Sequence, residues 1–338
     1  MSKHAIFDKK NILVTGGAGF VGSHLCDELI KTAKVICIDN FSTGDERNID
    51  HLLSNPDFEF IKYDITEPLD LEAMPELEKF RIKFQGVQEI YNLACPASPK
   101  KFDENKTATV MANSVGVKNM LDLAINYKAK FVHFSSSVVY GEKRKINERI
   151  TEEDFGQVDP NSARCSYDEG KRFSEALVST YCQVYSLEAK IIRVFRTYGP
   201  RMKLNDGHMF PDMVVNALNN ENLVIHGDEH FASSMCYISD LIDGVIKVAE
   251  SSLSGPVNIG SEVEVKFSEV AGKIIKILDS KSKITYDKET LVMTPLCLPD
   301  TAKMRQELGW LPVVTLDKGL EKTVDNLRAS KNLMNVRS

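Results

Sequence analysis

Short hydrophobic runs alternate with amphipathic stretches over the first 200 residues of the chain. Residues 11–15 form an apolar run, and the stretch after it places Phe20, Leu25 and Leu29 at helical spacing before a second run at 35–38. Further alternation follows, with apolar runs at 58–62, 89–93, 131–135 and 190–194 and helical stretches near 105–126 and 168–187. Strands that alternate with helices predict an α/β fold with a doubly wound parallel sheet.

The pattern changes after residue 200, where segments shorten and Gly, Pro and Asn punctuate them. We therefore predict a larger domain made of residues 1–200, to which a stretch at about 238–260 returns. The remaining segments, about 201–237 and 261–330, are predicted to form a smaller, interleaved lobe that binds the substrate.

Composition narrows the class of protein without choosing a function. The 338 residues are 43% hydrophobic and 27% charged, with a formal net charge of -6, which suits a chain with a sizeable folded core. The mild acidity argues against nucleic-acid or membrane partners, because both favour a basic face. No run reaches the roughly 18 apolar residues of a membrane helix, and the N-terminus lacks the apolar core of a secretory signal.

The seven cysteines are scattered, and no two of them form a Cys-x-x-Cys pair. This spacing predicts neither a disulfide framework nor a zinc site. His208 and His226 stand among turn residues without a cluster of further ligands, so we expect no bound metal. These features predict a soluble, reduced protein of the cytoplasm.

Three glycines follow the first apolar run. Gly16, Gly19 and Gly22 stand three residues apart where the strand turns into a helix. Glycine permits a tight turn, a close backbone approach to a pyrophosphate, and close packing of helix on strand. The N–H groups of Phe20 and Val21 lie at the positive end of the helix dipole, which suits a phosphate. The spacing departs by one residue from G-x-G-x-x-G, so a glycine-rich turn without a ligand is the alternative.

A carboxylate closes the second strand about 20 residues beyond the glycines, where dinucleotide-binding domains hold a ribose. Asp39 would accept hydrogen bonds from both ribose hydroxyls, and its charge would repel a 2′-phosphate. This order predicts a Rossmann-type domain that binds NAD rather than NADP. The alternative is that Asp39 caps the turn at 40–44. Asp64 and Ile65 are candidates for the adenine edge.

A tyrosine and a lysine carry the candidate chemistry. Tyr167 and Lys171 are four residues apart, which on a helix puts both side chains on one face. A phenol titrates near pH 10, but an adjacent ammonium and a nicotinamide cation stabilise the phenolate and lower that value. Ser136 could orient a substrate oxygen and complete the proton path. The alternative is a pair of solvated helix residues, which the upstream nucleotide-binding unit disfavours.

With these motifs the chain resembles an extended short-chain dehydrogenase/reductase of the NAD-dependent nucleotide-sugar epimerase/dehydratase family. The matching stretches run through nearly the whole chain: 15–25, 39–44, 91–99, 135–141, 167–172, 193–202, 205–207 and 308–312. Within this family the sequence is most similar to the UDP-glucuronate decarboxylases, a likeness carried by Asn92–Pro99, Cys165–Arg172 and Gly199–Met202.

The resemblance implies a reaction that begins at C4 of a nucleotide-linked sugar. Tyr167, helped by Ser136 and Lys171, would take the proton of the C4 hydroxyl while a hydride passes to tightly held NAD. The resulting keto sugar would lose carbon dioxide, be reduced again on its other face, or lose water.

The resemblance also implies a set of ligand contacts. The implied cofactor-binding residues are Gly16, Gly19, Phe20, Val21, Gly22, Asp39, Asn40, Ser42, Thr43, Gly44, Asp64, Ile65, Leu93, Ala94 and Lys171. The implied substrate-binding residues are Pro96, Ser137, Arg196 and Arg201.

Val138 departs from the family, whose decarboxylases and dehydratases usually carry Glu two residues after the catalytic Ser or Thr. Valine cannot transfer a proton, which disfavours loss of water most. A β-keto acid can lose carbon dioxide without a base at that carbon, and the epimerases tolerate a small apolar residue here. Decarboxylation of UDP-glucuronate and 4-epimerisation of UDP-glucuronate or a UDP-hexose therefore both stay open.

Further departures concern the binding of the substrate anion. Relatives usually have Arg where this chain has Ser233, and tend to have one near Cys297, whereas Arg196 stands where they usually have Asn. Arg196 and Arg201 could form a relocated phosphate clamp, or Arg196 could meet a sugar carboxylate. The alternatives are a surface or interlobe ion pair, or a substrate that is not a standard UDP-sugar.

Two other functions and one assembly follow from these patterns. The missing arginines leave open a dehydrogenase of a non-nucleotide sugar or polyol. A catalytically silent NAD-binding protein is a further alternative, which the intact catalytic residues count against. Apolar residues cover more than one face of 105–126 and 168–187, and relatives pair two such helices into a four-helix bundle, so we expect a homodimer. Burial within one chain is the alternative.

Overall fold

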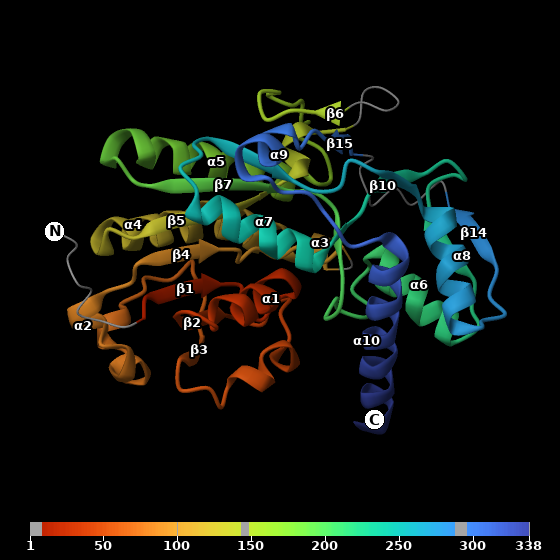
Figure 1. Cartoon of the computed structure of the whole chain (residues 1–338), viewed down its shortest axis with the longest axis horizontal. Helices are drawn as coiled ribbons and strands as arrows, with labels where there is room; N and C mark the ends of the chain where they lie inside the picture. The colour runs from red at the N-terminus through yellow and green to blue at the C-terminus, as the bar shows by residue number, and fades with distance from the viewer. Residues whose placement is uncertain (1–8, 100, 143–148, 288–295, 338) are drawn as a thin grey trace. The chain divides into compact units, whose positions relative to one another are not determined.

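The computed structural model describes residues 9–99, 101–142, 149–287 and 296–337, which form two compact units (Figure 1). Each unit is assembled from separate stretches of the chain. The first comprises Met1–Pro96, Lys106–Ser135 and Gly170–Ile191, and the second Ala97–Asn105, Ser136–Glu169 and Ile192–Ser338. These units reflect packing alone, so the predicted division into a cofactor domain and a substrate lobe stays a prediction.

The large parallel sheet has the strand order β12-β7-β5-β4-β1-β2-β3. Its strands are β1 (Asn11–Thr15), β2 (Lys34–Asp39), β3 (Phe58–Lys62), β4 (Glu89–Asn92), β5 (Lys130–Ser136), β7 (Ala189–Val194) and β12 (Pro256–Ile259). Every residue of β1 is buried, and β1 pairs in parallel with β2 on one side and β4 on the other. This arrangement explains its continuous apolar run and confirms the predicted doubly wound α/β fold.

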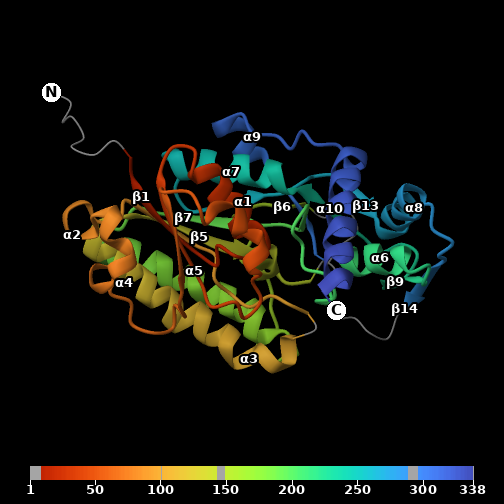
Figure 2. The same cartoon turned by 90° about the horizontal axis from the view of Figure 1, so that it is seen from below.

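Helices cover both faces of the strands of the first unit. Figure 2 shows α4 (Val117–Tyr127) and α5 (Cys165–Tyr185) side by side on one face and α1 (Phe20–Leu29) on the other. Leu121 and Val178 from the first two helices share a core with Leu13 and Phe131 of the sheet. The segment predicted as one helix near 105–126 comprises α3 (Phe102–Met111) and α4, joined by a π-helical turn at Ala112–Gly116.

Short helical segments of three to six residues connect several of these elements. They are α2 (Ile82–Gln85), η1 (Glu46–Asn48), η2 (Asp50–Leu52), η3 (Leu71–Ala73), η4 (Pro75–Phe80) and, in the second unit, η6 (Ser137–Tyr140). The last of these begins directly after β5, so it places the residues that follow Ser136.

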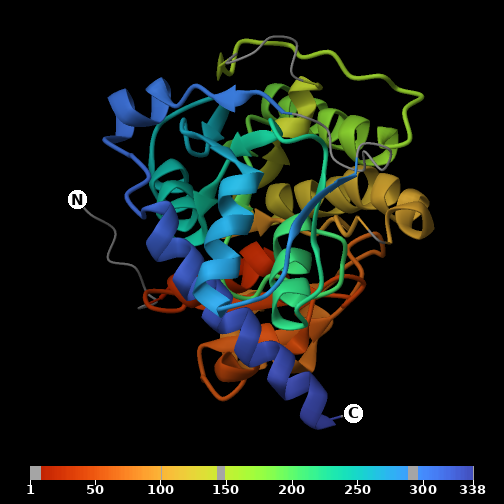
Figure 3. The ribbon, with the colours of Figure 1, turned by 90° about the vertical axis from the view of Figure 1, so that its right-hand side faces the viewer.

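Outside the large sheet, the second unit consists of strands of two to four residues and of helices. The strands are β6 (Arg149–Ile150), β8 (Thr197–Tyr198), β9 (Leu223–His226), β10 (Ala232–Ser234), β11 (Cys236–Tyr237), β13 (Glu264–Lys266), β14 (Ile284–Asp287) and β15 (Leu298–Pro299). The helices are α6 (Met209–Leu218), α7 (Ile238–Glu250), α8 (Phe267–Leu278), α9 (Ala302–Leu308) and α10 (Leu316–Arg337). The strands pair as β10-β13, β11-β8, β14-β9 and β15-β6, and α6, α8 and α10 pack together (Figure 3).

Three further observations concern the described part of the chain. No helix there combines the length and hydrophobicity needed to cross a membrane. No group of three or more His, Cys, Asp or Glu side chains among the same residues could hold a metal ion. The seven cysteines, which all lie within the described ranges, are free thiols.

Candidate active site

The strand order of the sheet reverses between β1 and β4, because β2 and β3 lie on one side of β1 and β4 and β5 on the other. In open α/β sheets, ligands bind outside the carboxyl ends of the strands at such a switch point. Thr15 ends β1, and its partners Ile38 and Asn92 lie at the ends of β2 and β4. The first unit therefore carries its predicted cofactor residues at the edge where the fold favours a ligand.

The glycine turn packs so closely against neighbouring backbone that side chains would not fit. Gly16 has a φ of 71°, and a Cβ there would lie 2.9 Å from both the Cα and the N of Ala94. A Cβ on Gly22 would lie 2.2 Å from the carbonyl oxygen of Gly16. Gly19 precedes α1 without capping it through a side chain, and the first turn of that helix contains no acidic residue. The backbone at Phe20 and Val21 is thus well suited to a pyrophosphate.

Asp39 is fixed at the end of β2 by two backbone donors. Its Oδ2 accepts from the N–H of Ala18 at 3.1 Å, and its Oδ1 accepts from the N–H of Phe41 at 2.8 Å. A Cβ on Gly44 would lie 2.9 Å from both carboxylate oxygens. The residue therefore caps the turn at 40–44, as the alternative held, and at the same time holds its carboxylate where a ribose is expected.

The candidate adenine contacts lie beside this turn. Asn40 bridges the turn, because its Nδ2 donates to Asp64 at 2.8 Å and its Oδ1 accepts from the N–H of Ser42 at 2.9 Å. Burial raises the pKa of Asp64, but hydrogen bonds from Thr66 and Asn40 outweigh it, and the net pKa is lowered. Ile65 is 4% exposed and packs into the core of the first unit.

The catalytic candidates lie at the start of α5 and the end of β5. Tyr167 and Lys171 are one turn apart on the helix; Tyr167 is half-buried and Lys171 is buried. The ammonium of Lys171 donates to the carbonyl oxygen of Phe134 at 2.8 Å. Ser136 ends β5 and accepts from the N–H of Val138 at 3.4 Å, which starts the turn η6.

The residues around Ser136 are buried, but they differ in chemistry. Ser137 is 3% exposed and Val138 is 6% exposed, so both lie inside the second unit. Val138 leaves an apolar side chain where an acid would transfer protons. In the first unit, Pro96 accepts a weak hydrogen bond from the Thr109 hydroxyl at 3.5 Å.

A buried polar network lies behind Lys171 within the first unit. The hydroxyl of Thr15 donates to Asn92, whose Nδ2 lies 3.3 Å from Nδ1 of His133. Nε2 of His133 lies 2.8 Å from the hydroxyl of Ser174, and that hydroxyl donates to the carbonyl oxygen of Lys171 at 2.8 Å. Burial, and then the charge of Lys171, hold the pKa of His133 well below its usual range.

Arg196, one of the two arginines of the candidate phosphate clamp, contacts Ser233 in the second unit. Arg196, between β7 and β8, donates through Nε to the hydroxyl of Ser233 at 3.1 Å. Its guanidinium carbon lies 5.4 Å from the ring centroid of Phe267. Burial, and then the charge of Arg164, lower the pKa of Arg196 to about 10, so the group stays positive at neutral pH. Two of the positions that depart from the family pattern, Arg196 and Ser233, are therefore direct neighbours.

The other arginines of this unit have defined surroundings. Arg164 forms an ion pair with Asp168 at 3.4 Å and lies 5.7 Å from the ring centroid of Phe102. Burial raises the pKa of Asp168, although Arg164 opposes the shift. Arg201 has a φ of 67°, and its backbone N–H donates to Asn326 of α10 at 2.8 Å. This hydrogen bond ties the backbone of Arg201 to α10.

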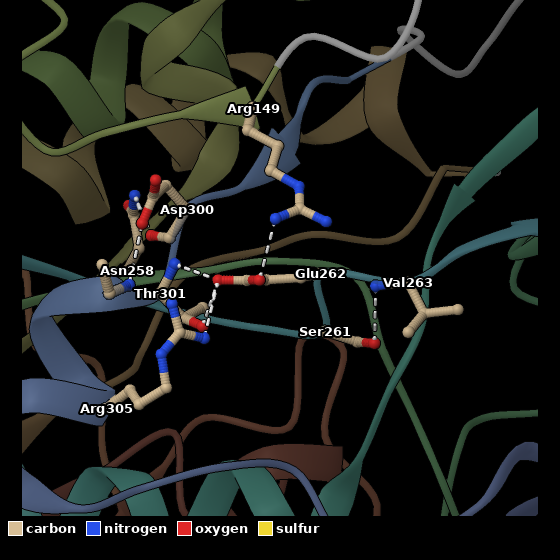
Figure 4. A network of polar contacts seen from close by, with 9 residues as sticks. Arg149, Asn258, Ser261, Glu262, Val263, Asp300, Thr301 and Arg305 are labelled. Carbon is tan, nitrogen blue, oxygen red and sulfur yellow. Dashed lines mark hydrogen bonds and ion pairs between the residues drawn. The ribbon is translucent and has the colours of Figure 1, made fainter.

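The segment around Cys297 has a structural environment. The thiol is 4% exposed and packs with Tyr140 and Phe195. Figure 4 shows how the following residues are held by the carboxylate of Glu262. Its Oε1 accepts from both the N–H and the hydroxyl of Thr301 at 2.8 Å. Its Oε2 accepts from Arg149 at 3.0 Å, and Arg305 adds an ion pair at 3.5 Å.

Several of these residues were not predicted from the sequence. Asn92 ends β4 and gives little signal, and Ser174 resembles any helix serine. His133 stands between apolar residues inside β5, a signal that could have pointed to it. Arg164 and Phe267 lie 32 positions before and 71 positions after Arg196, and no spacing rule joins such residues.

A doubly wound sheet with a glycine turn at its switch point and a carboxylate after β2 defines a dinucleotide-binding protein. The profile of the "NAD dependent epimerase/dehydratase family" matches residues 12–260. The chain belongs to this family, and it is accordingly an NAD-dependent enzyme.

Known proteins match nearly the full chain in sequence or in structure. UDP-glucuronic acid decarboxylase 1 of Xenopus tropicalis is 37% identical over 95% of this chain and 73% of its own length. UDP-glucuronic acid decarboxylase 4 of Arabidopsis thaliana is 39% identical over 94% of this chain and 68% of its own. The structure of UDP-glucuronic acid 4-epimerase from Bacillus cereus in complex with NAD is 29% identical, with a TM-score of 0.79 over 95% of this chain and 98% of that one.

The buried state of His133 predicts an acid sensitivity of folding. Its folded pKa is lowered, whereas the unfolded chain takes up a proton below about pH 6.5, so stability is lost as pH falls below that value. The slope from this residue is at most about 1.4 kcal/mol per pH unit. Urea unfolding at pH 7.0 and 5.5 should show a smaller loss of stability for His133→Gln than for the native protein, and equal losses would contradict this.

Proposed function

We propose that the protein oxidises UDP-glucuronate at C4 of the sugar and then decarboxylates it. The observation that carries this proposal is the similarity to UDP-glucuronic acid decarboxylases over 94–95% of the chain at 37–39% identity. The Tyr167–Lys171 pair at the start of α5 supports it, because it supplies a proton acceptor at the expected place. Loss of water is disfavoured, since the buried Val138 has no proton to exchange.

In the proposed mechanism, the protein's own residues accept the proton of the C4 hydroxyl and stabilise the charge of the phenolate. Tyr167 accepts the proton of the C4 hydroxyl, and Ser136 orients that oxygen by a hydrogen bond. Lys171, anchored to the carbonyl oxygen of Phe134, stabilises the phenolate with its positive charge. NAD, when bound by the glycine turn and Asp39, supplies the hydride chemistry.

Carbon dioxide then leaves the keto acid. The bond between C5 and the carboxylate breaks, and its electron pair moves into the enolate of the C4 ketone. Protonation at C5 and reduction at C4 complete the conversion without net oxidation.

We assign the cofactor to residues 1–200 with about 238–260, and the substrate to about 201–237 and 261–330. The cytoplasm is the expected compartment, because seven free thiols suit a reducing environment.

A 4-epimerase is the second candidate function. Val138 favours it, since the reaction needs no acid at that position. The likeness to the UDP-glucuronic acid 4-epimerase structure supports the same possibility. Both candidates share the first step and the same catalytic residues, so only the product separates them.

Incubation of the purified protein with UDP-glucuronate tests the function directly. We expect a product lighter by carbon dioxide in mass spectrometry, with a pentose pattern in the proton NMR spectrum. A product of unchanged mass would indicate the 4-epimerase, and no turnover of any UDP-sugar would contradict both. Tyr167→Phe should lower kcat by about 100- to 10,000-fold. Tyr185→Phe, at an exposed position of the same helix, should leave it unchanged.

Arg196 is the proposed pyrophosphate ligand, because its planar fork suits two oxygens. Arg196→Asn should weaken the binding of UDP by about 10- to 100-fold, the loss of one charge-assisted hydrogen bond. Ser233 lies 3.1 Å from Nε of Arg196, so adding Ser233→Arg should restore part of the affinity. Calorimetry measures both Kd values, with the exposed Arg328→Asn as control. Weakened binding of UDP-glucuronate with unchanged binding of UDP would assign Arg196 to the sugar carboxylate instead.

A homodimer is proposed through the exposed face of α5 and the end of α3. Phe173 and Val184 are 53% and 64% exposed on α5, and Val110 and Met111 are 44% and 40% exposed on α3. Phe173→Glu should therefore yield a monomer in light scattering after gel filtration. Phe84→Glu, at a phenylalanine that is 83% exposed elsewhere, should leave the mass unchanged. A native protein that already elutes as a monomer would contradict the dimer.

A further inference from the structure

Five buried residues form a continuous hydrogen-bonded chain, called the relay below, inside the first unit. The chain runs from Thr15 through Asn92, His133 and Ser174 to the backbone of Lys171, with steps of 2.8, 3.3, 2.8 and 2.8 Å. None of the five is more than 5% exposed. It therefore joins the strand that leads into the glycine turn to the lysine of the candidate catalytic pair.

The direction of every step is fixed from the Thr15 end. The backbone N–H groups of Leu93 and Ala94 both donate to the Thr15 hydroxyl oxygen, at 3.2 and 3.3 Å. That oxygen is thereby occupied as an acceptor, and its proton points to Oδ1 of Asn92. Asn92 must then turn its amide nitrogen toward His133. Nδ1 of His133 is thus an acceptor, and the proton of the neutral ring is on Nε2.

The second half of the chain transmits this arrangement to the lysine. Nε2–H of His133 donates to the Ser174 hydroxyl, which in turn donates to the carbonyl oxygen of Lys171. The ammonium of Lys171 returns to the same strand and donates to the carbonyl oxygen of Phe134, next to His133. Both the backbone and the charged end of the lysine are therefore tied to two adjacent residues of β5.

At its Thr15 end, close packing links the hydrogen-bonded chain to the glycine turn. The backbone that Thr15 binds includes Ala94, against which Gly16 packs so closely that no Cβ fits. An apolar pair in place of His133 and Ser174 would fill similar space without the desolvation of polar groups. The polar chain thus places the lysine relative to the glycine turn, at a desolvation cost that core packing does not require.

We propose that His133 and Ser174 are positioning residues that hold Lys171 in the geometry that proton transfer by Tyr167 requires. This inference rests on the proposed function, since it takes Lys171 as the group that stabilises the phenolate. A neutral Nε2–H tautomer of His133 is the state that the relay needs, because a second proton on Nδ1 would face the amide protons of Asn92.

The first test compares two hydroxyl deletions on the same helix. Ser174→Ala removes the relay, whereas Thr180→Ala removes a similar hydroxyl bond to the carbonyl oxygen of Ala176 at an exposed position. We expect Ser174→Ala to lower kcat about tenfold with little change in KM, because misplacement of a catalytic group affects the transition state most. The acid limb of its pH profile should shift upward, since a displaced ammonium stabilises the phenolate less.

The second test measures the tautomer and the protonation of His133 in the absence of turnover. In protein labelled with 15N-histidine, His133 is assigned by the loss of its signals in His133→Gln. We expect the Nε2–H tautomer and no titration between pH 8 and 5.5. Ser174→Ala should change these ring shifts, and Thr180→Ala should not. A His133 that titrates with an ordinary pKa, or carries its proton on Nδ1, overturns the proposal.

The outcomes separate this inference from the proposed function. If Tyr167→Phe abolishes turnover and Ser174→Ala matches Thr180→Ala in kcat and pH profile, the relay is overturned and the proposed function stands. A lower melting temperature in Ser174→Ala with an unshifted pH profile overturns it in the same way, because a purely structural role is then sufficient. If Tyr167→Phe stays fully active, the proposed function fails, and the positioning role fails with it.

Discussion

The hydroxyl of Thr15 occupies the point on which the candidate site depends. It ends β1 at the reversal of the strand order, and it binds the backbone N–H groups of Leu93 and Ala94. This contact draws the end of β4 against Gly16, so that the turn before α1 has room for glycine only. The same hydroxyl starts the hydrogen-bonded chain that ends at Lys171. One side chain at the switch point is therefore hydrogen-bonded both to the backbone that packs against the glycine turn and to the polar chain that ends at Lys171.

Lys171 and Arg196 are held in different surroundings, each within its own unit. Lys171 is a compact ammonium, which donates to the carbonyl oxygen of Phe134 at 2.8 Å. Arg196 has a flat guanidinium, which lies by the ring of Phe267 and hydrogen-bonds the hydroxyl of Ser233. These local arrangements reconcile a net charge of -6 with an anionic substrate. A few desolvated positive groups act at short range, where the charge of the whole surface matters little.

Order and periodicity made most of the fold predictable. Apolar runs gave the central strands to within a residue, because strands buried on both faces carry an unbroken hydrophobic signal. The π-helical turn at Ala112–Gly116 was not predicted, since helix periodicity continues through it. His133 and Ser174 are 41 residues apart, and the contact of Arg196 with Ser233 spans 37. Such pairs depend on how strands and helices are brought together, which local spacing does not encode.

Asp39 has a role in the fold besides the ribose contact proposed for it. Its carboxylate is the anion that occupies two converging backbone donors, the N–H groups of Ala18 and Phe41. Those donors belong to the turns themselves and persist whatever side chain occupies position 39. A shorter, uncharged residue there would leave these N–H groups without the carboxylate, and converging backbone donors favour an anion. The expected preference for NAD over NADP would therefore depend on the one carboxylate of Asp39, because the backbone beneath it suits a phosphate.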